Sequence, residues 1–222
     1  MLALAWVAVY PLSYATAGLV RARRNQRFRK PFVLWLLVWS APAAVLLVAR
    51  PWLLWVGLGY LALFGVNLGY ARRNDERSLV NDAVLVVECA AVVALCWAVG
   101  AGTQGWTPPA LSEAPARLPV LVLVCALVLV GSTLHVKSLV RERRDPRYAL
   151  ASRVVAAVSV VAAAGLALWW GAPGGLWLLV PFVVLAARSL LLGRRPVRPA
   201  RVGLVELGCF VLVTVMAIAA AA

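Results

Sequence analysis

The amino-acid sequence predicts an all-α integral membrane protein, a polytopic bundle of about eight transmembrane helices. Composition is the first reason: 64% of the 222 residues are apolar, 14% are charged, and the mean hydropathy is +0.91. Soluble domains have about 45–50% apolar and about 25% charged residues. The second reason is that the apolar residues form runs of about 17 to 22 residues. A helix of that length crosses a hydrocarbon layer of ~30 Å.

Eight such runs follow one another, and we expect them to form a single domain over residues 1–222. Each is predicted to be a helix, because unpaired backbone groups are costly in lipid and the sequence lacks the alternation typical of barrel strands. The predicted spans are approximately residues 2–20, 31–49, 51–70, 82–100, 118–136, 149–170, 176–192 and 202–221.

The basic residues divide the connections into two classes. Twenty of the 22 fall in every second connection, and the remaining connections contain only Arg50 and Arg117. Because cytoplasmic loops of membrane proteins carry an excess of Lys and Arg, the basic connections are predicted to face the cytoplasm and both termini the outside. The basic connections lie within residues 21–30, 72–77, 137–153 and 188–201.

The net charge of +14 would suit a nucleic-acid partner in a soluble chain. Here the basic residues lie between apolar runs rather than on one patch, so the expected partners are the lipid bilayer and its anionic lipids, and no nucleic acid. The chain has 20 Arg and 2 Lys and is rich in Ala, Val and Leu, which is typical of GC-rich bacterial genomes. The predicted location is therefore the bacterial inner (plasma) membrane.

Ionisable residues inside the spans are functional candidates, because a charge at the bilayer centre costs at least ~2.5 kcal/mol. Glu88, His135 and Glu206 lie within or at the end of predicted spans. The direction of each span places all three in the cytoplasmic third of the membrane, where Asn67 and Arg188 join them. Glu88 caps no helix, so it needs a partner.

Two Asn-Asp pairs, Asn74-Asp75 and Asn81-Asp82, precede Glu88 at intervals of seven residues. On one helix Asn74, Asn81 and Glu88 would share a face, with Asp75 and Asp82 beside it. Carboxylates near arginines suit a Mg²⁺-diphosphate site, with Asp75 and Asp82 as metal ligands. The alternative stays open: Asp75 and Glu76 pair with the arginines at 72, 73 and 77, and Asn81-Asp82 caps the next helix.

Residues 135–148 contain the densest group of polar side chains in the chain. If residues 120–145 form one helix, an acceptor-rich side contains His135, Ser138, Glu142 and Asp145. A donor-rich side that suits a phosphate or carboxylate then contains Lys137, Arg141, Arg144 and Tyr148. The alternative is that the arginines only hold the membrane topology. Asp145-Pro146 is the expected stop, because the residue before a proline avoids the α region.

Two stretches, YARRNDERSLVND and HVKSLVRERRDPRYALASR, resemble the YwiC-like proteins, a family of uncharacterised bacterial multi-pass membrane proteins. The resemblance covers most of the chain. It implies an additional first helix with a Gln-His-Gly-Ala-Trp motif, absent here, and hence nine spans in the complete protein. A looser similarity connects the chain to UbiA-type prenyltransferases, which have nine helices. Their first acidic motif would fall at residues 21–30, which contain no acidic residue, so that catalytic pattern is not met.

The leading functional hypothesis is a cytoplasm-facing polar cavity that binds a phosphorylated or anionic lipid-like ligand. Mg²⁺ would accompany a diphosphate. The first alternative is a UbiA-like prenyl or lipid transferase, and the second is a small-solute or proton-coupled transporter. The third alternative is a role in assembly. Whether the chain is an enzyme stays open. The candidate ligand-binding residues are Asn74, Asp75, Asn81, Asp82, Glu88, His135, Lys137, Ser138, Arg141, Glu142, Arg144 and Glu206.

Overall fold

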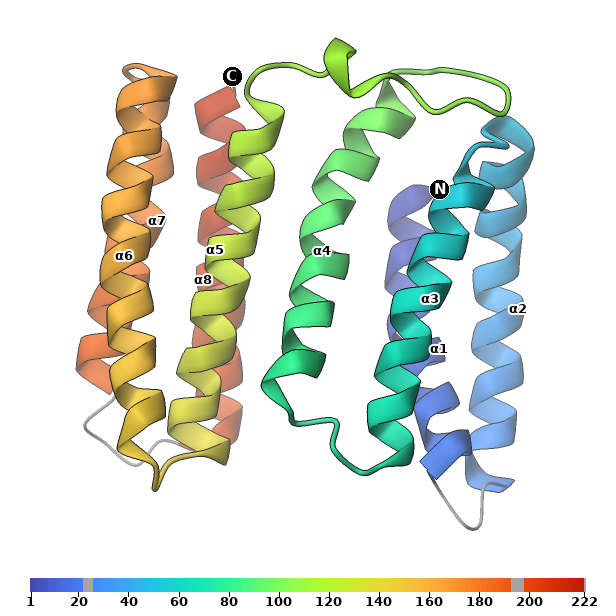
Figure 1. Cartoon of the computed structure of the whole chain (residues 1–222), viewed down its shortest axis with the longest axis horizontal. Helices are drawn as coiled ribbons and strands as arrows, with labels where there is room; N and C mark the ends of the chain where they lie inside the picture. Colours follow the sequence, from blue (N-terminus) through green and yellow to red (C-terminus); the bar gives the residue numbers. More distant parts are fainter. Residues whose placement is uncertain (22–25, 193–197, 222) are drawn as a thin grey trace. The chain divides into compact units, whose positions relative to one another are not determined.

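A computed structural model describes residues 1–21, 26–192 and 198–221. Within these residues the chain is helical without strands, and it forms eight helices long and apolar enough to cross a membrane (Figure 1). This confirms the predicted fold class. The helices are α1 (Leu2–Arg21), α2 (Gln26–Ala49), α3 (Leu53–Arg72), α4 (Leu79–Gly100), α5 (Leu118–Val136), α6 (Pro146–Trp170), α7 (Gly174–Leu192) and α8 (Pro199–Ala221).

The helices form two compact units. The N-terminal unit, Met1–Pro115, contains α1 to α4, and the C-terminal unit, Ala116–Ala222, contains α5 to α8. The single domain expected over residues 1–222 therefore stays a prediction.

In the N-terminal unit, α1 packs against α2 and α3, and α3 packs against α4. Arg21 at the end of α1 forms an ion pair with Glu76 in the turn after α3, with 2.9 Å between Nη1 and Oε2. At the opposite end, Trp52 is 1% exposed. Its backbone N–H donates to the carbonyl of Gly105 (3.1 Å) and its indole N–H to that of Thr103 (3.3 Å). Trp52 thus holds the long connection that follows α4.

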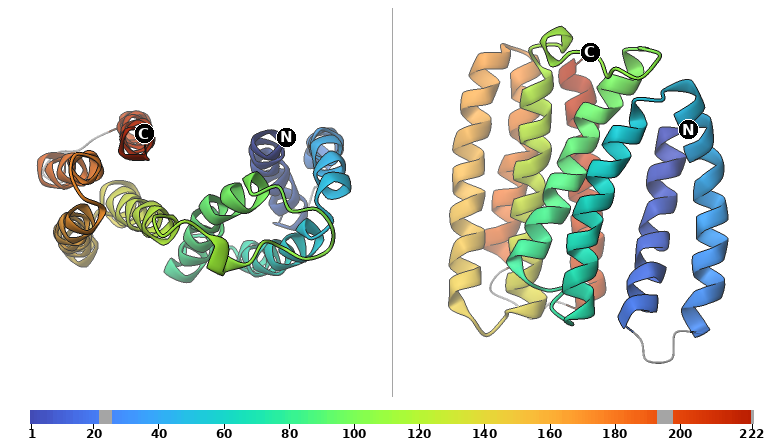
Figure 2. Two further views of the ribbon diagram at one scale, coloured as in Figure 1. Left: turned by 90° about the horizontal axis from the view of Figure 1, so that it is seen from above. Right: turned by 45° about the vertical axis from the view of Figure 1, so that its right-hand side comes forward.

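In the C-terminal unit, successive helices pack against one another, and α5 also contacts α7 and α8 (Figure 2). Val120, Val124 and Val128 repeat every four residues along α5 and so form one buried stripe. They belong to the same core as Leu178 and Phe182 of α7. The unit therefore has a core of its own.

The predicted spans match the observed helices, but several helices begin earlier than predicted. α2 begins at Gln26 rather than residue 31, and α6 begins at Pro146 rather than residue 149. The difference has a physical cause. Hydropathy identifies only the residues inside the hydrocarbon layer, whereas the hydrogen-bonded helix can extend beyond that layer into polar residues. A proline is tolerated in the first turn because its missing N–H would have no helical partner there.

The helix expected over residues 120–145 is not continuous, which corrects the two-sided arrangement predicted for residues 135–148. α5 ends at Val136 and is followed by a π-helical turn, η2 (Lys137–Arg141). The N–H of Glu142 donates to the carbonyl of Lys137 at 2.7 Å, five residues back. Asp145 then caps α6 by accepting from the N–H of Arg147 at 2.9 Å. The chain thus turns between Glu142 and Asp145.

Asn74 also departs from the prediction, because it lies outside α4 with a φ of 55°. It ends α3: the N–H of Asn74 donates to the carbonyl of Ala71 (3.1 Å), and the N–H of Asp75 donates to that of Tyr70 (2.9 Å). These are the two bonds of a Schellman motif, which favours Gly or Asn at the left-handed position. Asn74 therefore does not share a helical face with Asn81 and Glu88.

The close approach of α6 and α7 at Gly175 leads to a first testable prediction. A Cβ atom at this position would overlap the backbone carbonyl oxygen of Ala167, which belongs to the last turns of α6. Gly175→Ala is expected to lower the free energy of unfolding by about 1–3 kcal/mol, because overpacking forces the backbones apart. Thermal unfolding of the purified protein in mild detergent measures the change.

The matched control is Gly165→Ala on α6, where an added Cβ would meet no neighbouring atom within 4 Å. It is expected to leave the unfolding temperature unchanged or slightly raised, because alanine favours the helix by up to ~1 kcal/mol. Equal losses in the two variants would contradict the close approach at Gly175.

Candidate functional site

Two buried charges of opposite sign meet in the C-terminal unit, on Arg188 of α7 and Glu206 of α8, each 7% exposed. Their side chains form an ion pair with 2.5 Å between Nη1 and Oε1. The pair has the distance of an ionic contact but not the alignment of a hydrogen bond. Pairing within the unit offsets part of the cost of burying each charge.

Helix α5 contributes two further polar side chains to this pair. Ser132 donates a hydrogen bond from Oγ to Oε2 of Glu206 at 2.5 Å. His135 lies one turn later on the same helix, is 1% exposed, and lies within electrostatic range of Arg188. Its Nε2 has no hydrogen-bond partner among the described residues. We call Ser132, His135, Arg188 and Glu206 the Arg188–Glu206 centre.

The local sequence explains why the centre forms. Ser132 and His135 are three residues apart on α5, so they share a face. Glu206 lies two turns into α8, after the start of that helix at Pro199. Arg188 lies near the C-terminal end of α7, which runs back toward the same end of the unit. The predicted common level of His135, Arg188 and Glu206 is thus confirmed within this unit.

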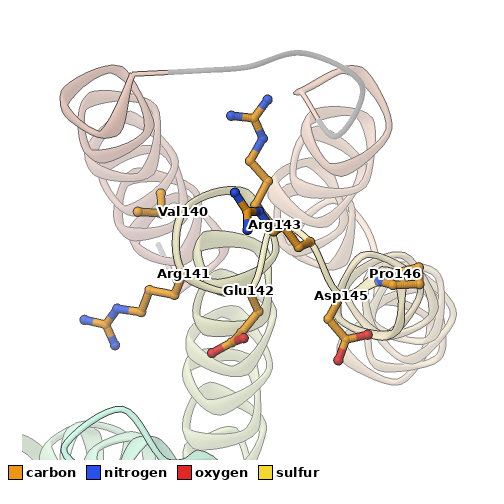
Figure 3. Close-up of a pocket in the computed structure, with 7 residues that line it drawn as sticks. Val140, Arg141, Glu142, Arg143, Asp145 and Pro146 are labelled. Carbon is orange, nitrogen blue, oxygen red and sulfur yellow. The ribbon is translucent and has the colours of Figure 1, made fainter.

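The connection from α5 to α6 forms the second feature of the C-terminal unit. Residues Val140 to Pro146 line an open hollow, and Arg141, Arg143 and Arg144 are exposed there. Figure 3 shows the side chains of Arg141, Glu142 and Asp145 fanning outward from the loop rather than converging. We call residues 140–146 the basic loop.

Two other predicted residues lie at the start of this loop but face different surroundings. Lys137 is buried in the first residue of the π-helical turn, whereas Arg141 and Arg144 are exposed. Ser138 is half-buried and donates from Oγ to the carbonyl of His135 at 2.7 Å. The structure thus separates Lys137 from the exposed arginines with which it was grouped, and a shared role in anion binding stays a prediction.

In the N-terminal unit Glu88 has the partner that the sequence required. Its two carboxylate oxygens accept from Nδ2 of Asn67, each at 3.2 Å. Tyr60 donates from Oη to the backbone carbonyl of Glu88 at 2.8 Å. The expected common level of Asn67 and Glu88 is confirmed, and the pair links α3 to α4.

The remaining acidic candidates lie around the turn between these helices. Ser78, not Asn81-Asp82, caps α4: its Oγ accepts from the N–H of Asn81 at 3.2 Å. Asn81 is buried and donates from Nδ2 to the carbonyl of Glu76 at 2.9 Å. Asp75 is exposed in the turn, and Asp82 lies in the first turn of α4.

No group of three or more His, Cys, Asp or Glu side chains is arranged to hold a metal ion in the part of the chain that the structure describes. The role of Asp75 and Asp82 as ligands of Mg²⁺ stays a prediction. The candidate residues are divided between the units: Asn74, Asp75, Asn81, Asp82 and Glu88 lie in the first, and the other seven in the second.

Sequence reasoning missed three serines of the C-terminal unit, Ser132, Ser152 and Ser159. Ser132 carried a signal, because it precedes the candidate His135 by three residues and so lies on the same helical face. Ser152 and Ser159 are buried on α6, and their Oγ atoms have no hydrogen-bond partner among the residues described. The sequence contains no comparable signal for these two serines, because a serine among alanines and valines is usually interpreted as a small packing residue.

The family model described as "YwiC-like protein" matches residues 1–98. The chain is 32% identical over 150 residues to "Uncharacterized protein YwiC" of Bacillus subtilis, covering 65% of this chain and 54% of that protein. It is 26% identical over 155 residues to an "Uncharacterized protein" of Haemophilus influenzae, covering 68% of this chain and 59% of that protein. The chain thus spans little more than half the length of these relatives. No solved structure shows significant similarity.

Proposed function

We propose that this chain, whose residues 1–98 match the model of the YwiC-like family, is a multi-pass membrane protein that binds phosphorylated or otherwise anionic, lipid-like ligands at its basic loop. We place it in a bacterial inner membrane with its basic connections in the cytoplasm. Support comes from the bacterial relatives, from the eight membrane-capable helices, and from the concentration of Arg and Lys in every second connection.

The basic loop is the observation that carries this proposal. Three arginines, Arg141, Arg143 and Arg144, are exposed around one open hollow. Guanidinium groups bind phosphate through paired N–H donors, and each basic residue near an anionic membrane surface contributes about 1 kcal/mol. The outward orientation of the side chains suits several headgroups at a bilayer surface better than one enclosed ligand.

The first experiment neutralises this loop. A variant with Arg141→Gln, Arg143→Gln and Arg144→Gln is expected to bind phosphatidylglycerol-containing vesicles more weakly by about 3 kcal/mol, roughly 100-fold. The reason is the loss of three positive charges at the membrane surface. Binding of the purified protein, held in nanodiscs, to labelled vesicles measures the difference.

The control is a triple variant in the N-terminal unit, Arg27→Gln, Arg29→Gln and Lys30→Gln, whose side chains are also exposed. An equal loss in both variants would assign the affinity to total charge and overturn the assignment to the basic loop. A second arm adds an isoprenyl diphosphate with and without Mg²⁺ and follows thermal stability, which rises by about 2.7 kcal/mol at a hundredfold excess over Kd. A rise that needs Mg²⁺ and disappears in Asp75→Asn and Asp82→Asn would support the metal site.

Small-solute or proton-coupled transport is a second candidate, favoured by ionisable side chains within the spans. Glu88 on α4 and the Arg188–Glu206 centre are the groups concerned. The test is proton flux into proteoliposomes followed with a pH-sensitive dye. Flux that is lost in Glu88→Gln but kept in Glu113→Gln, an exposed carboxylate outside the spans, would favour transport. A UbiA-like transferase would instead release diphosphate from an isoprenyl diphosphate.

A further inference from the structure

A small cavity lies between α5, α6 and α7, beside the Arg188–Glu206 centre. The space that it offers to the centre of a water-sized sphere is about 10 Å³, close to the minimum that one water molecule needs. One part of its wall is apolar, and the other consists of three buried polar residues. The lining residues are Leu127, Gly131, Ala156, Ser159, Phe182, Leu185, Arg188 and Ser189.

Two polar atoms of this wall make no hydrogen bond to any residue that the structure describes. They are Nε of Arg188 and Oγ of Ser159, on side chains of residues that are 7% and 5% exposed. A buried donor without a partner costs about 1–3 kcal/mol, and more for a charged group. The two residues belong to different helices and line the same cavity, so one small ligand can serve both.

Ser159 differs from Ser189 and Thr214, two other hydroxyl side chains of the spans in the C-terminal unit. Serine and threonine inside helices commonly bond back to the carbonyl four residues earlier. Ser189 does so with Leu185 at 3.0 Å, and Thr214 with Phe210 at 2.9 Å. Ser159 does not, so its hydroxyl is available to the cavity. The Oγ of Ser189 uses its proton for Leu185 and keeps its lone pairs as acceptors.

The charge balance selects the ligand. Arg188 is already paired with Glu206, so the centre is neutral as a pair. An anion in the cavity would add an unpaired charge inside the span, which is costly. A neutral molecule that both accepts and donates fits instead: it accepts from Nε of Arg188 and bonds to the hydroxyls of Ser159 and Ser189. Buried water molecules make 2–4 such bonds.

We propose that this cavity is a water-binding site that completes the hydrogen bonds of Arg188 and joins α7 to α6 through Ser159. The water accepts from Nε of Arg188, whereas Nη1 of the same guanidinium faces Glu206. The site is independent of anion binding at the basic loop, since the two share no residue.

The test is oxidative labelling by hydroxyl radicals that an X-ray pulse generates from bound water, with the full chain in nanodiscs and mass spectrometry as the readout. Phe182 and Leu185 line the cavity and are expected to be labelled. Leu178 is equally buried on the same helix but does not line the cavity, and it is expected to stay unlabelled. Equal labelling of Leu178 and Phe182, or none at either, would overturn the proposal.

Two variants of α6 make the test specific. Ser159→Val removes a partner and fills the cavity, so labelling of Phe182 and Leu185 is expected to be lost. Ser152→Val alters a serine that is also buried and unbonded but lies outside the cavity, so labelling is expected to persist. Labelling that survives Ser159→Val would contradict the site.

A third variant covers the case in which Ser159→Val does not fold. Gly131→Ala places a methyl group at the cavity wall, where no atom lies within 4 Å of the new Cβ. It is expected to reduce the labelling while the unfolding temperature stays close to that of the native protein. Undiminished labelling in Gly131→Ala would also count against a water at this position.

Discussion

Glu206→Gln is expected to lower the free energy of unfolding by about 3–5 kcal/mol, because it leaves the buried charge of Arg188 without its carboxylate. Glutamine has nearly the size of glutamate and keeps an oxygen that can accept from Ser132. The loss of stability therefore measures mainly the removal of the negative charge. Equilibrium unfolding in mixed micelles with increasing denaturing detergent measures the change. The apolar double variant Arg188→Met with Glu206→Leu is expected to recover most of the loss, since it removes both buried charges.

Glu113→Gln is the matched control for the same chemical change. Glu113 is exposed in the short helix η1 (Leu111–Glu113) in the connection after α4, and its substitution is expected to change stability by no more than about 0.5 kcal/mol. If Glu206→Gln were as mild as this control, the ion pair of the Arg188–Glu206 centre would carry no net stability. If the double variant were worse than the single one, the pair would have a role beyond charge balance.

Trp52→Ala is expected to lower the free energy of unfolding of the N-terminal unit by about 3–5 kcal/mol, the usual cost of removing a buried large aromatic side chain. The variant also loses the hydrogen bond from the indole to Thr103, which holds residues 101–115 against the start of α3. We therefore expect faster cleavage of that connection in limited proteolysis, together with a lower unfolding temperature.

Trp55→Ala provides the comparison within the same helix turn. Trp55 is 59% exposed, and its removal is expected to change stability by less than about 1 kcal/mol. In limited proteolysis of this variant, the connection after α4 is expected to be cleaved at the same rate as in the native protein. Similar proteolysis in both variants would mean that Trp52 does not hold the connection.

The helices were predictable because lipid allows few alternatives. An apolar run of about 20 residues has to satisfy its backbone internally, so its position in the sequence defines the span. The ends were less predictable, because the same rule ceases to apply outside the hydrocarbon layer. Thus α2 continues to Gln26 through residues that hydropathy excludes. At the end of α5, no residue of Lys137–Arg141 is a helix breaker, so nothing in the sequence signalled the π-helical turn.

The parts of the candidate site that depend only on the depth of a residue in the membrane were predictable. The directions of the spans placed Asn67, Glu88, His135, Arg188 and Glu206 at one level. Within each unit the members of this group do meet, Asn67 with Glu88 and Arg188 with Glu206. Partner choice could not be predicted in the same way. Whether a serine bonds to its own helix, as Ser189 does, or faces a cavity, as Ser159 does, depends on the rotation of neighbouring helices, and the sequence does not report it.

The left-handed backbone at Asn74 changes how related sequences are best compared at this position. If related sequences had only Asn or Gly at this position, the reason would be the backbone conformation, since these residues tolerate a positive φ best. Asp75 follows in the same turn, but its side chain is exposed and free of that constraint. An acidic residue kept at position 75 would therefore be the sign of a ligand, whereas an unchanging Asn74 would only record where α3 ends.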